Sequence, residues 1–167
     1  MKHKPLLTIG IPAYNVELYI EDTVLSIAKS KNHDKLEILI INDGSSDQTL
    51  EIANRLAKEH SCIKVIDKPN GGHGSAINAA LKNATGRYFR LLDGDDWFDT
   101  NEFDCYLKKL ETETADIVFT DLVECFIKSN LNISTFRNYI SVLVFIYSKE
   151  NCRRGQKRCK WCWMISV

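Results

Sequence analysis

The spacing of hydrophobic residues alternates along the chain between short continuous runs and helical periodicity. Short aliphatic and β-branched runs predict strands buried on both faces, at 6–11, 36–41, 62–66 and 87–92. Between these runs, apolar residues recur at helical spacing, at 17–30, 47–59 and 74–84. A helix that begins near Thr100 and a strand at 116–124 continue the series. This alternation predicts an α/β fold with a mostly parallel sheet and helices on both faces.

The same pattern predicts structural roles for five residues. Thr100 is expected to cap the helix that it begins, and Gly86 to stop the helix at 74–84. Cys62, Cys105 and Cys125 lie inside periodic segments, which predicts small core side chains.

Polar or glycine-rich loops follow the first four predicted strands. They contain the segments PAYN (12–15), NDGSSD (42–47), KPNGGHG (68–74) and DGDDWFD (93–99). In open parallel sheets, ligands bind beyond the carboxyl ends of the strands. We therefore expect these loops to lie at one edge of the sheet and to form the functional site.

The loop at 93–99 crowds four carboxylates directly after a predicted strand. Their repulsion would raise the pKa of at least one of them unless a cation offsets the charge. Mg²⁺ and Mn²⁺ take one or two carboxylates from a protein and complete their coordination with phosphate oxygens and water. Asp93 and Asp95 are two positions apart, which favours a metal site facing a diphosphate. The alternative is an acidic turn that caps the next helix, and this explains Asp99 best.

Two residues after the first two strands suit a nucleoside. Asp43 ends the second predicted strand, where a carboxylate is well placed to accept a hydrogen bond from a nucleobase imide. A simple turn explains residues 44–47 well and Asp43 less well. Tyr14 suits stacking on a base, and equally suits packing as a half-buried side chain.

The segment NGGHGSAIN (70–78) opens a predicted helix with glycines. Exposed amides at Gly72 and its neighbours would suit a phosphate or a sugar hydroxyl, with a flexible turn as the competing interpretation. His73 would contact the phosphate or the sugar, or would lie in solvent.

Charge and composition narrow the class of partner. The chain of 167 residues has 22 basic and 22 acidic side chains, and this balance argues against nucleic acid as a partner. The beginning lacks the features of a signal peptide, and the longest apolar run, 139–147, is shorter than the ~20 residues that span a bilayer. We therefore expect a cytoplasmic protein. Basic residues from 149 onward leave open a peripheral contact with the inner face of the membrane.

Five segments, in order and spacing, resemble the family-two nucleotide-diphospho-sugar glycosyltransferases of the A-type fold. The resemblance covers residues 6 to about 121 and rests on TIGIPAYN, ILIINDGSSDQTLEIA, NGGHGSAIN, ATGRYFRLLDGDDW and ADIVFTD. It implies an inverting enzyme of cell-surface polysaccharide synthesis that uses a bound Mn²⁺ or Mg²⁺. The implied donor is a UDP- or dTDP-sugar, and the implied acceptor is a hydroxyl on a saccharide or a lipid-linked molecule.

The resemblance also implies roles for single residues. Asp93 would approach the ribose or diphosphate, and Asp93 and Asp95 would ligate the metal ion. Family members often carry Arg before the Asn of the third motif, where this chain has Ile77, so one phosphate or base contact is in question. The residues implied in nucleotide-sugar binding are Pro12, Ala13, Tyr14, Asp43, Gly72, His73, Asn78 and Asp93.

The resemblance ends before the chain does. We expect a nucleotide-sugar-binding domain at 1–129 and an irregular basic tail, rich in Cys and Trp, at 130–167, truncated or frame-shifted near Tyr139. Family members are longer and carry their general base downstream, so no catalytic base is named here. The alternative to an enzyme is a catalytically silent nucleotide-sugar-binding module. The sugar, the acceptor and the oligomeric state stay open.

Overall fold

A parallel sheet forms the centre of the molecule. The computed structural model describes residues 4–115, 118, 125–126 and 134–135. In these residues the main sheet has four strands in the order β3-β2-β1-β4, and Leu7 of β1 lies between Leu36 of β2 and Tyr88 of β4. The strands are β1 (Leu7–Ala13), β2 (Leu36–Asp43), β3 (Ile63–Lys68) and β4 (Tyr88–Leu91). The four strands predicted up to residue 92 are thus confirmed.

Helices connect these strands, as the periodicity predicts. They are α1 (Ile20–Ala28), α2 (Thr49–Glu59), α3 (His73–Asn83) and α4 (Thr100–Thr112), with a short 3₁₀ turn, η1 (His33–Lys35), before β2. Two further short strands, β5 (Cys125–Phe126) and β6 (Ser134–Thr135), pair antiparallel. The first helix begins three residues later than expected, because residues 17–19 form a turn.

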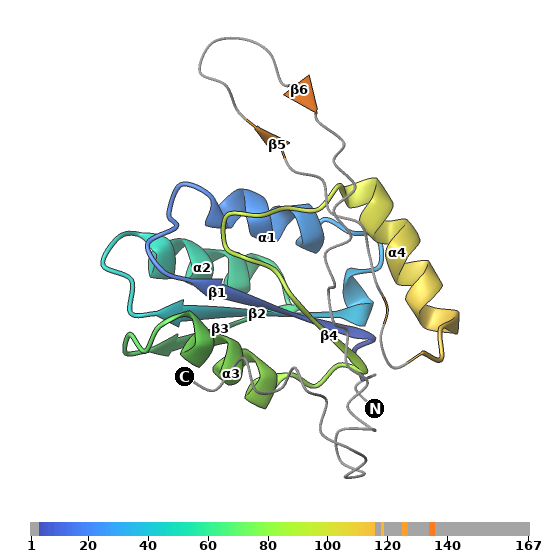
Figure 1. The fold of residues 1–167 in the computed structure, drawn as a ribbon, viewed down its shortest axis with the longest axis horizontal. Coiled ribbons are helices and arrows are strands. Elements are labelled where there is room, and N and C mark those ends of the chain that lie inside the picture. The colour runs from blue at the N-terminus through green and yellow to red at the C-terminus, as the bar shows by residue number, and fades with distance from the viewer. Residues whose placement is uncertain (1–3, 116–117, 119–124, 127–133, 136–167) are drawn as a thin grey trace.

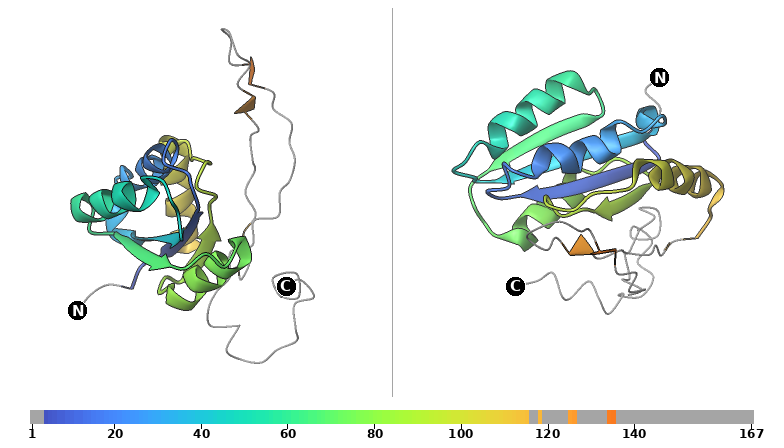
Figure 2. Two further views of the ribbon diagram at one scale, coloured as in Figure 1. Left: turned by 90° about the vertical axis from the view of Figure 1, so that its left-hand side faces the viewer. Right: turned by 90° about the horizontal axis from the view of Figure 1, so that it is seen from above.

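The helices cover both faces of the sheet, which gives three layers. Figures 1 and 2 show α1 and α2 on one side of the sheet and α3 on the other. The larger hydrophobic core joins the sheet to α1, α2 and α4, and the smaller core joins it to α3. The predicted α/β fold, with a parallel sheet and helices on both faces, is therefore confirmed.

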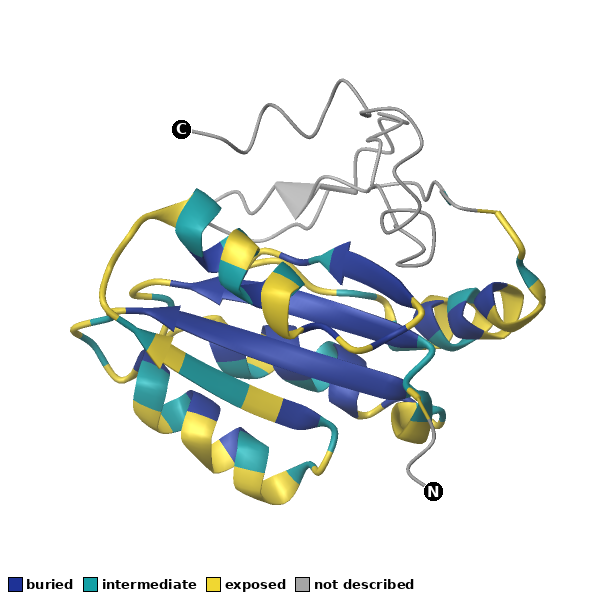
Figure 3. Cartoon of the chain, turned by 90° about the horizontal axis from the view of Figure 1, so that it is seen from below, coloured by how far each residue is buried: buried dark blue, intermediate teal, exposed yellow. Residues whose placement is uncertain are grey.

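The sheet is most deeply buried at its centre (Figure 3). Every residue of β1 and β2 is buried, whereas β3, at one edge, alternates buried, partly buried and exposed positions. Helix α3 approaches β1 closely, since a Cβ added to Gly10 would lie 2.8 Å from Ala80 Cβ and 2.9 Å from the Phe89 ring. The small residues of α3 thus fix this helix tightly against the strands that carry the loops.

Three residue-level expectations are corrected by the packing. Cys105 is exposed on α4, because it lies on the face opposite the buried Phe103 and Leu107, so it is not a core residue. Helix α3 ends at Asn83 without Gly86, whose absent side chain instead allows close contact with Thr8, 2.7 Å from the added Cβ.

The cap of α4 differs in the same way. Asp99, not Thr100, is the N-cap: its side chain accepts hydrogen bonds from the N–H groups of Asn101 and Glu102 at 2.9 and 3.1 Å. The competing interpretation of Asp99 as a cap is thus confirmed.

Several expectations fall outside the described residues. They concern the strand at 116–124, of which Val118 alone is described, the side chain of Cys125, the domain boundary at 129 and the tail at 130–167. Cys62, by contrast, is partly buried against the larger core, and burial raises the pKa of its thiol. None of the helices in the described ranges is long and apolar enough to cross a membrane.

Candidate nucleotide-binding site

The loops after β1, β2, β3 and β4 all leave the same edge of the sheet, because the strands are parallel. Ala13, Asp43 and Lys68 are the last residues of β1, β2 and β3. The loop with Asp93 follows β4, and the helix that begins at His73 starts at this same edge. The structure therefore brings the four predicted loops together.

Asp43 is a buried anion held by the neighbouring strand. It is 3% exposed and lies opposite Lys68 in the register of β2 and β3. Its Oδ1 accepts hydrogen bonds from the Lys68 amine and, at 3.0 Å, from the N–H of Gly71. Burial by itself raises the pKa of Asp43, but these donors together bring that pKa below its ordinary value. Asp43 is thus an ionised hydrogen-bond acceptor at the end of β2.

The loop after β1 is fastened to the loop after β2. Asn15 has a left-handed backbone with φ 53°, and its N–H donates to Ser45 Oγ at 3.1 Å. The Asn15 side-chain oxygen accepts from the Ser46 N–H at 2.9 Å. Tyr14, the residue just before, is 53% exposed. Its ring therefore lies at the surface, on a loop whose backbone is fixed.

The glycine-rich loop after β3 packs against the loop after β2. Gly44 has φ 73°, and a Cβ there would lie 2.7 Å from the Asn70 nitrogen. Gly72, with φ 81°, is the N-cap of α3 and has no side chain to cap the helix. The first N–H groups of α3 lack intrahelical acceptors and so are available at this edge.

The acidic loop after β4 presses against the end of β1. Gly94 is buried, its carbonyl accepts a hydrogen bond from Thr23 Oγ1 at 3.0 Å, and a Cβ there would lie 3.0 Å from the Pro12 oxygen. A turn closes the loop, with the Asp96 N–H donating to the Asp93 carbonyl at 3.1 Å. The residue between the two predicted metal ligands thus fixes the loop on the sheet, while Asp93 and Asp95 themselves are exposed.

The charges of this loop act on Asp96. Asp96 is exposed, yet partial desolvation raises its pKa, and the negative charges of Asp93 and Asp95 raise it further. His73 Nε2 lies 3.8 Å from Asp93 Oδ1, so the loops after β3 and β4 meet here. The expected repulsion is therefore present, and it falls on the third carboxylate of the group.

The described residues do not form a complete metal site by themselves. Among them, no group of three or more His, Cys, Asp or Glu side chains is arranged to hold a metal ion. Asp93 and Asp95 offer two exposed carboxylates. Mg²⁺ and Mn²⁺ accept this number of protein ligands when phosphate oxygens and water supply the rest.

The side chains of Pro12, Ala13 and Asn78 form no hydrogen bond or ion pair with the other predicted site residues in the described part of the chain. Pro12 and Ala13 are buried at the end of β1, so a ligand at this edge would meet their backbone. Asn78 is exposed on α3, five residues beyond the start of the helix, and forms no hydrogen bond with the described residues at the edge. Among the predicted site residues, His73 and Asp93 approach each other directly, whereas Asn78 lies farther along the helix.

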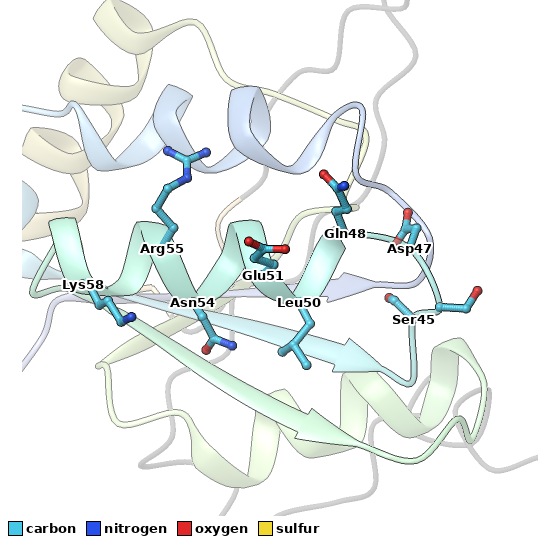
Figure 4. A pocket seen from close by; sticks show the side chains of 9 residues that line it. Ser45, Asp47, Gln48, Leu50, Glu51, Asn54, Arg55 and Lys58 are labelled. Carbon is cyan, nitrogen blue, oxygen red and sulfur yellow. The ribbon is translucent and has the colours of Figure 1, made fainter.

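A pocket beside this edge is lined by part of the loop after β2, but by none of the residues predicted to bind the nucleotide-sugar or the metal ion (Figure 4). Its Arg55 bridges Glu21 at 2.7 Å and Glu59 at 3.6 Å, which ties α1 to α2. The pocket runs from the loop after β2 along α2 and is lined by Ser45, Ser46, Asp47, Gln48, Leu50, Glu51, Asn54, Arg55 and Lys58.

Lys68 received no role of its own in the sequence analysis, which placed it in the loop segment 68–74. A lysine at the end of an edge strand carries no signal by itself. Its role follows from the strand order β3-β2 and from the register that sets it opposite Asp43.

Comparisons with known proteins agree with the predicted fold and family. A family model described as glycosyl transferase family 2 matches residues 8–164. The uncharacterized glycosyltransferase EpsJ of Bacillus subtilis (strain 168) is 40% identical over 114 residues, which cover 68% of this chain and 33% of EpsJ. The chondroitin synthase of Pasteurella multocida (strain Pm70) is 42% identical over 117 residues, 70% of this chain and 12% of the synthase. The chain spans a third or less of both relatives.

Solved structures show the same fold. Residues 1–349 of S. aureus TarS in complex with UDP-GlcNAc superpose with a TM-score of 0.61 and 29% identity, over 66% of this chain and 32% of that one. The mannosyltransferase PcManGT from Pyrobaculum calidifontis, in complex with GDP-Man and Mn²⁺, gives a TM-score of 0.60 at 24% identity, over 69% of this chain and 34% of that one. The second likeness supports the fold alone. Since the family model covers nearly the whole sequence and the fold agrees, this chain belongs to glycosyl transferase family 2.

Proposed function

We propose that this chain binds a UDP- or dTDP-sugar at the carboxyl edge of its sheet and takes part in moving the sugar to an acceptor hydroxyl in polysaccharide synthesis. The observation that carries the proposal is the buried, ionised Asp43 at the end of β2, at the same edge of the sheet as the exposed carboxylates of the loop after β4. Two similar proteins support it, one solved with UDP-GlcNAc and one named as a chondroitin synthase.

The nucleoside would lie between the first two loops. Uracil and thymine each carry one imide N–H, and the Asp43 carboxylate is an acceptor without a proton of its own. Tyr14, exposed on the adjoining loop, would stack on the base, and the backbone of Pro12 and Ala13 would border it.

The diphosphate would lie toward the start of α3 and the acidic loop. Asp93 and Asp95 fit Mn²⁺ or Mg²⁺, since both are hard oxygen ligands. Their negative charges also add to the desolvation that raises the pKa of Asp96. The ion, when bound, stabilises the negative charge that develops on the departing diphosphate. In this arrangement Gly72 and His73 border the phosphates.

The sugar would be transferred with inversion, and its position would lie beyond the diphosphate, within reach of α3 and Asn78. The acceptor is proposed to be a saccharide or a lipid-linked molecule, and the reaction to take place in the cytoplasm, at or near the inner face of the membrane. A general base is not assigned to any of the described residues.

A thermal-shift experiment on the 167-residue chain tests this proposal. UDP-sugars and dTDP-sugars with Mn²⁺ should raise the melting temperature, since a ligand at 100 times its Kd adds about 2.7 kcal/mol to the stability of the folded state. Asp43→Asn should lose most of the shift, while Glu51→Gln, on the exposed face of α2, should keep it. If no nucleotide diphosphate moves the melting temperature of the unaltered chain, the proposal is wrong.

Release of UDP then separates an enzyme from a silent binding module. A chain that transfers sugar, to an acceptor or to water, liberates UDP from one member of a panel of UDP-sugars. Binding without any release, across the panel and with added saccharide acceptors, identifies the binding module instead.

A further inference from the structure

We propose that Lys68 makes Asp43 selective for a uracil or thymine base by occupying one of its two carboxylate oxygens. This inference rests on the proposed binding of a nucleotide at Asp43 and goes beyond it, because it names the residue that determines which base is accepted. Lys68 is a positioning residue here: it acts on the base through Asp43.

The geometry of the strand ends fixes the contact. Asp43 and Lys68 are the final residues of β2 and β3 and are paired in register. The Lys68 amine donates to Asp43 Oδ1 and to the Pro69 carbonyl at 2.7 Å, and the Lys68 side chain is 21% exposed. The amine is thus held by two acceptors and is largely withdrawn from solvent.

Gly71 is the second donor to the same oxygen of Asp43. Its N–H donates to Asp43 Oδ1 at 3.0 Å, and a Cβ added to Gly71 would lie 3.1 Å from the Lys68 amine and 2.7 Å from Ser75 Oγ. A residue with a side chain would crowd the lysine. The backbone of this loop and the lysine therefore fit together around Oδ1.

The other oxygen of Asp43 is left for a ligand. The Gly72 N–H also lowers the pKa of Asp43, but it forms no hydrogen bond of ordinary geometry with either oxygen. Within the described residues no such bond reaches Oδ2, and Oδ2 is not among their buried side-chain atoms that lack a partner. It therefore reaches solvent, although the residue as a whole is 3% exposed. Asp43 presents one acceptor oxygen outward.

A single outward acceptor discriminates among bases. Uracil and thymine place one N–H between two carbonyls, which matches one acceptor oxygen. Cytosine has an unprotonated ring nitrogen at that position, which a carboxylate oxygen repels. Guanine presents two adjacent donors that pair best with both oxygens of a free carboxylate, and here Oδ1 is already filled by Lys68 and Gly71.

Calorimetric titration of the full chain with UDP, GDP and CDP, each with Mn²⁺, tests the inference. The unaltered chain should bind UDP at least about tenfold more tightly than GDP. Lys68→Met removes the charged donor to Oδ1 and leaves the Gly71 N–H alone on it, which should lower this UDP/GDP ratio about tenfold or more, through weaker UDP binding and stronger GDP binding. Lys68→Arg, which keeps a charged donor, should restore most of the ratio. An unchanged ratio in Lys68→Met overturns the inference.

Lys64→Met is the matched control. Lys64 lies on the same strand and also pairs with a buried carboxylate, Glu37, but at the opposite end of β2. Its loss should leave the UDP/GDP ratio as it is, and an equal effect of both variants would contradict a role specific to Lys68. Lys68→Gln, with the same expected loss, serves if the methionine variant does not fold. Absence of UDP binding in the unaltered chain would instead refute the proposed function.

Discussion

The four carboxylates of the loop at 93–99 are chemically different residues. Asp99 caps α4, and Asp96 has a pKa raised by partial desolvation and by its neighbours. All four residues are exposed, and Asp93 and Asp95 do not cap the helix. The sequence showed that a cap lies at this helix start, because a cap is defined by its place before a helix, but it offered Asp99 and Thr100 for the role and the structure selects Asp99.

Replacing Asp99 separates its structural role from ligand binding. Asp99→Ala removes the acceptor for two helix N–H groups and should lower the free energy of unfolding by about 1 kcal/mol, as measured by urea denaturation. UDP affinity in the presence of Mn²⁺ should stay within about twofold of that of the unaltered chain, because Asp99 bonds the start of α4 and not the proposed ligand. A loss of UDP binding with no loss of stability would assign Asp99 to the site instead.

Other residues were not predictable, because their roles depend on distant parts of the chain. Lys68 acts on Asp43, which is 25 positions away in sequence. Arg90 lies in a run that predicts a buried strand. The residue is 6% exposed, and its guanidinium lies over the rings of Phe98 and Tyr106, at 4.4 and 5.5 Å. Burial lowers the pKa of Arg90. The spacing of apolar residues predicts which positions are buried, but it does not predict which side chains a buried polar group contacts.

At the scale of elements, one buried carboxylate ties together the end of the sheet opposite the site. Glu37 of β2 is 2% exposed and accepts hydrogen bonds from Thr8 Oγ1 and Lys64 Nζ, both at 2.7 Å. It also accepts from the N–H and hydroxyl of Thr85, at 2.7 and 2.9 Å. Burial raises the pKa of Glu37, but these donors together hold that pKa below its ordinary value. β1, β2, β3 and the segment before β4 thus share one anion.

Glu37→Gln should therefore destabilise the fold in a pH-dependent way. At pH 7 the loss should be about 2–4 kcal/mol, because charged hydrogen bonds in a buried network are lost. A carboxyl group whose folded pKa is lowered contributes fully above its unfolded pKa of about 4.3, and this contribution disappears as the pH falls through the folded pKa. The difference between the two chains should shrink accordingly in urea unfolding measured from pH 7 to pH 3.

The pH dependence needs a control for general acid effects. Glu51→Gln, exposed on α2, should stay within about 0.5 kcal/mol of the unaltered chain across the same range. A deficit in Glu37→Gln that is the same at pH 7 and pH 3 would show that the carboxylate charge is not what holds these elements together.

Elements themselves were predicted well, and their ends less well. The strands and helices up to Thr112 lie where the periodicity places them, because each buries one continuous set of apolar residues. The ends depend on contacts that periodicity does not show. Helix α1 begins after a turn whose Val16 N–H donates to Thr49 Oγ1 at 2.9 Å. Gly86 lies against Thr8 of β1, where a side chain would not fit.

At the scale of the whole molecule, the parallel topology turns four separate loops into one site. The order β3-β2-β1-β4 sets the ends of β2 and β1 side by side, with the end of β3 on one flank and the end of β4 on the other, and His73 at the start of α3 reaches Asp93 of the acidic loop. The alternation of elements predicted the shared edge, but not the strand order that makes Asp43 and Lys68 neighbours. The chain spans 33% of EpsJ, and the acceptor side of the reaction stays a proposal.

The account depends most on a nucleotide that binds at this edge together with a divalent cation. The decisive measurement is calorimetric titration of UDP into the chain with and without Mn²⁺, repeated on Asp95→Asn and on Asp99→Asn as the matched acidic control. We predict that Mn²⁺ strengthens UDP binding at least about tenfold in the unaltered chain and in Asp99→Asn, and that this gain is lost in Asp95→Asn. UDP affinity that is equal with and without Mn²⁺, and unchanged in Asp95→Asn, would contradict the account.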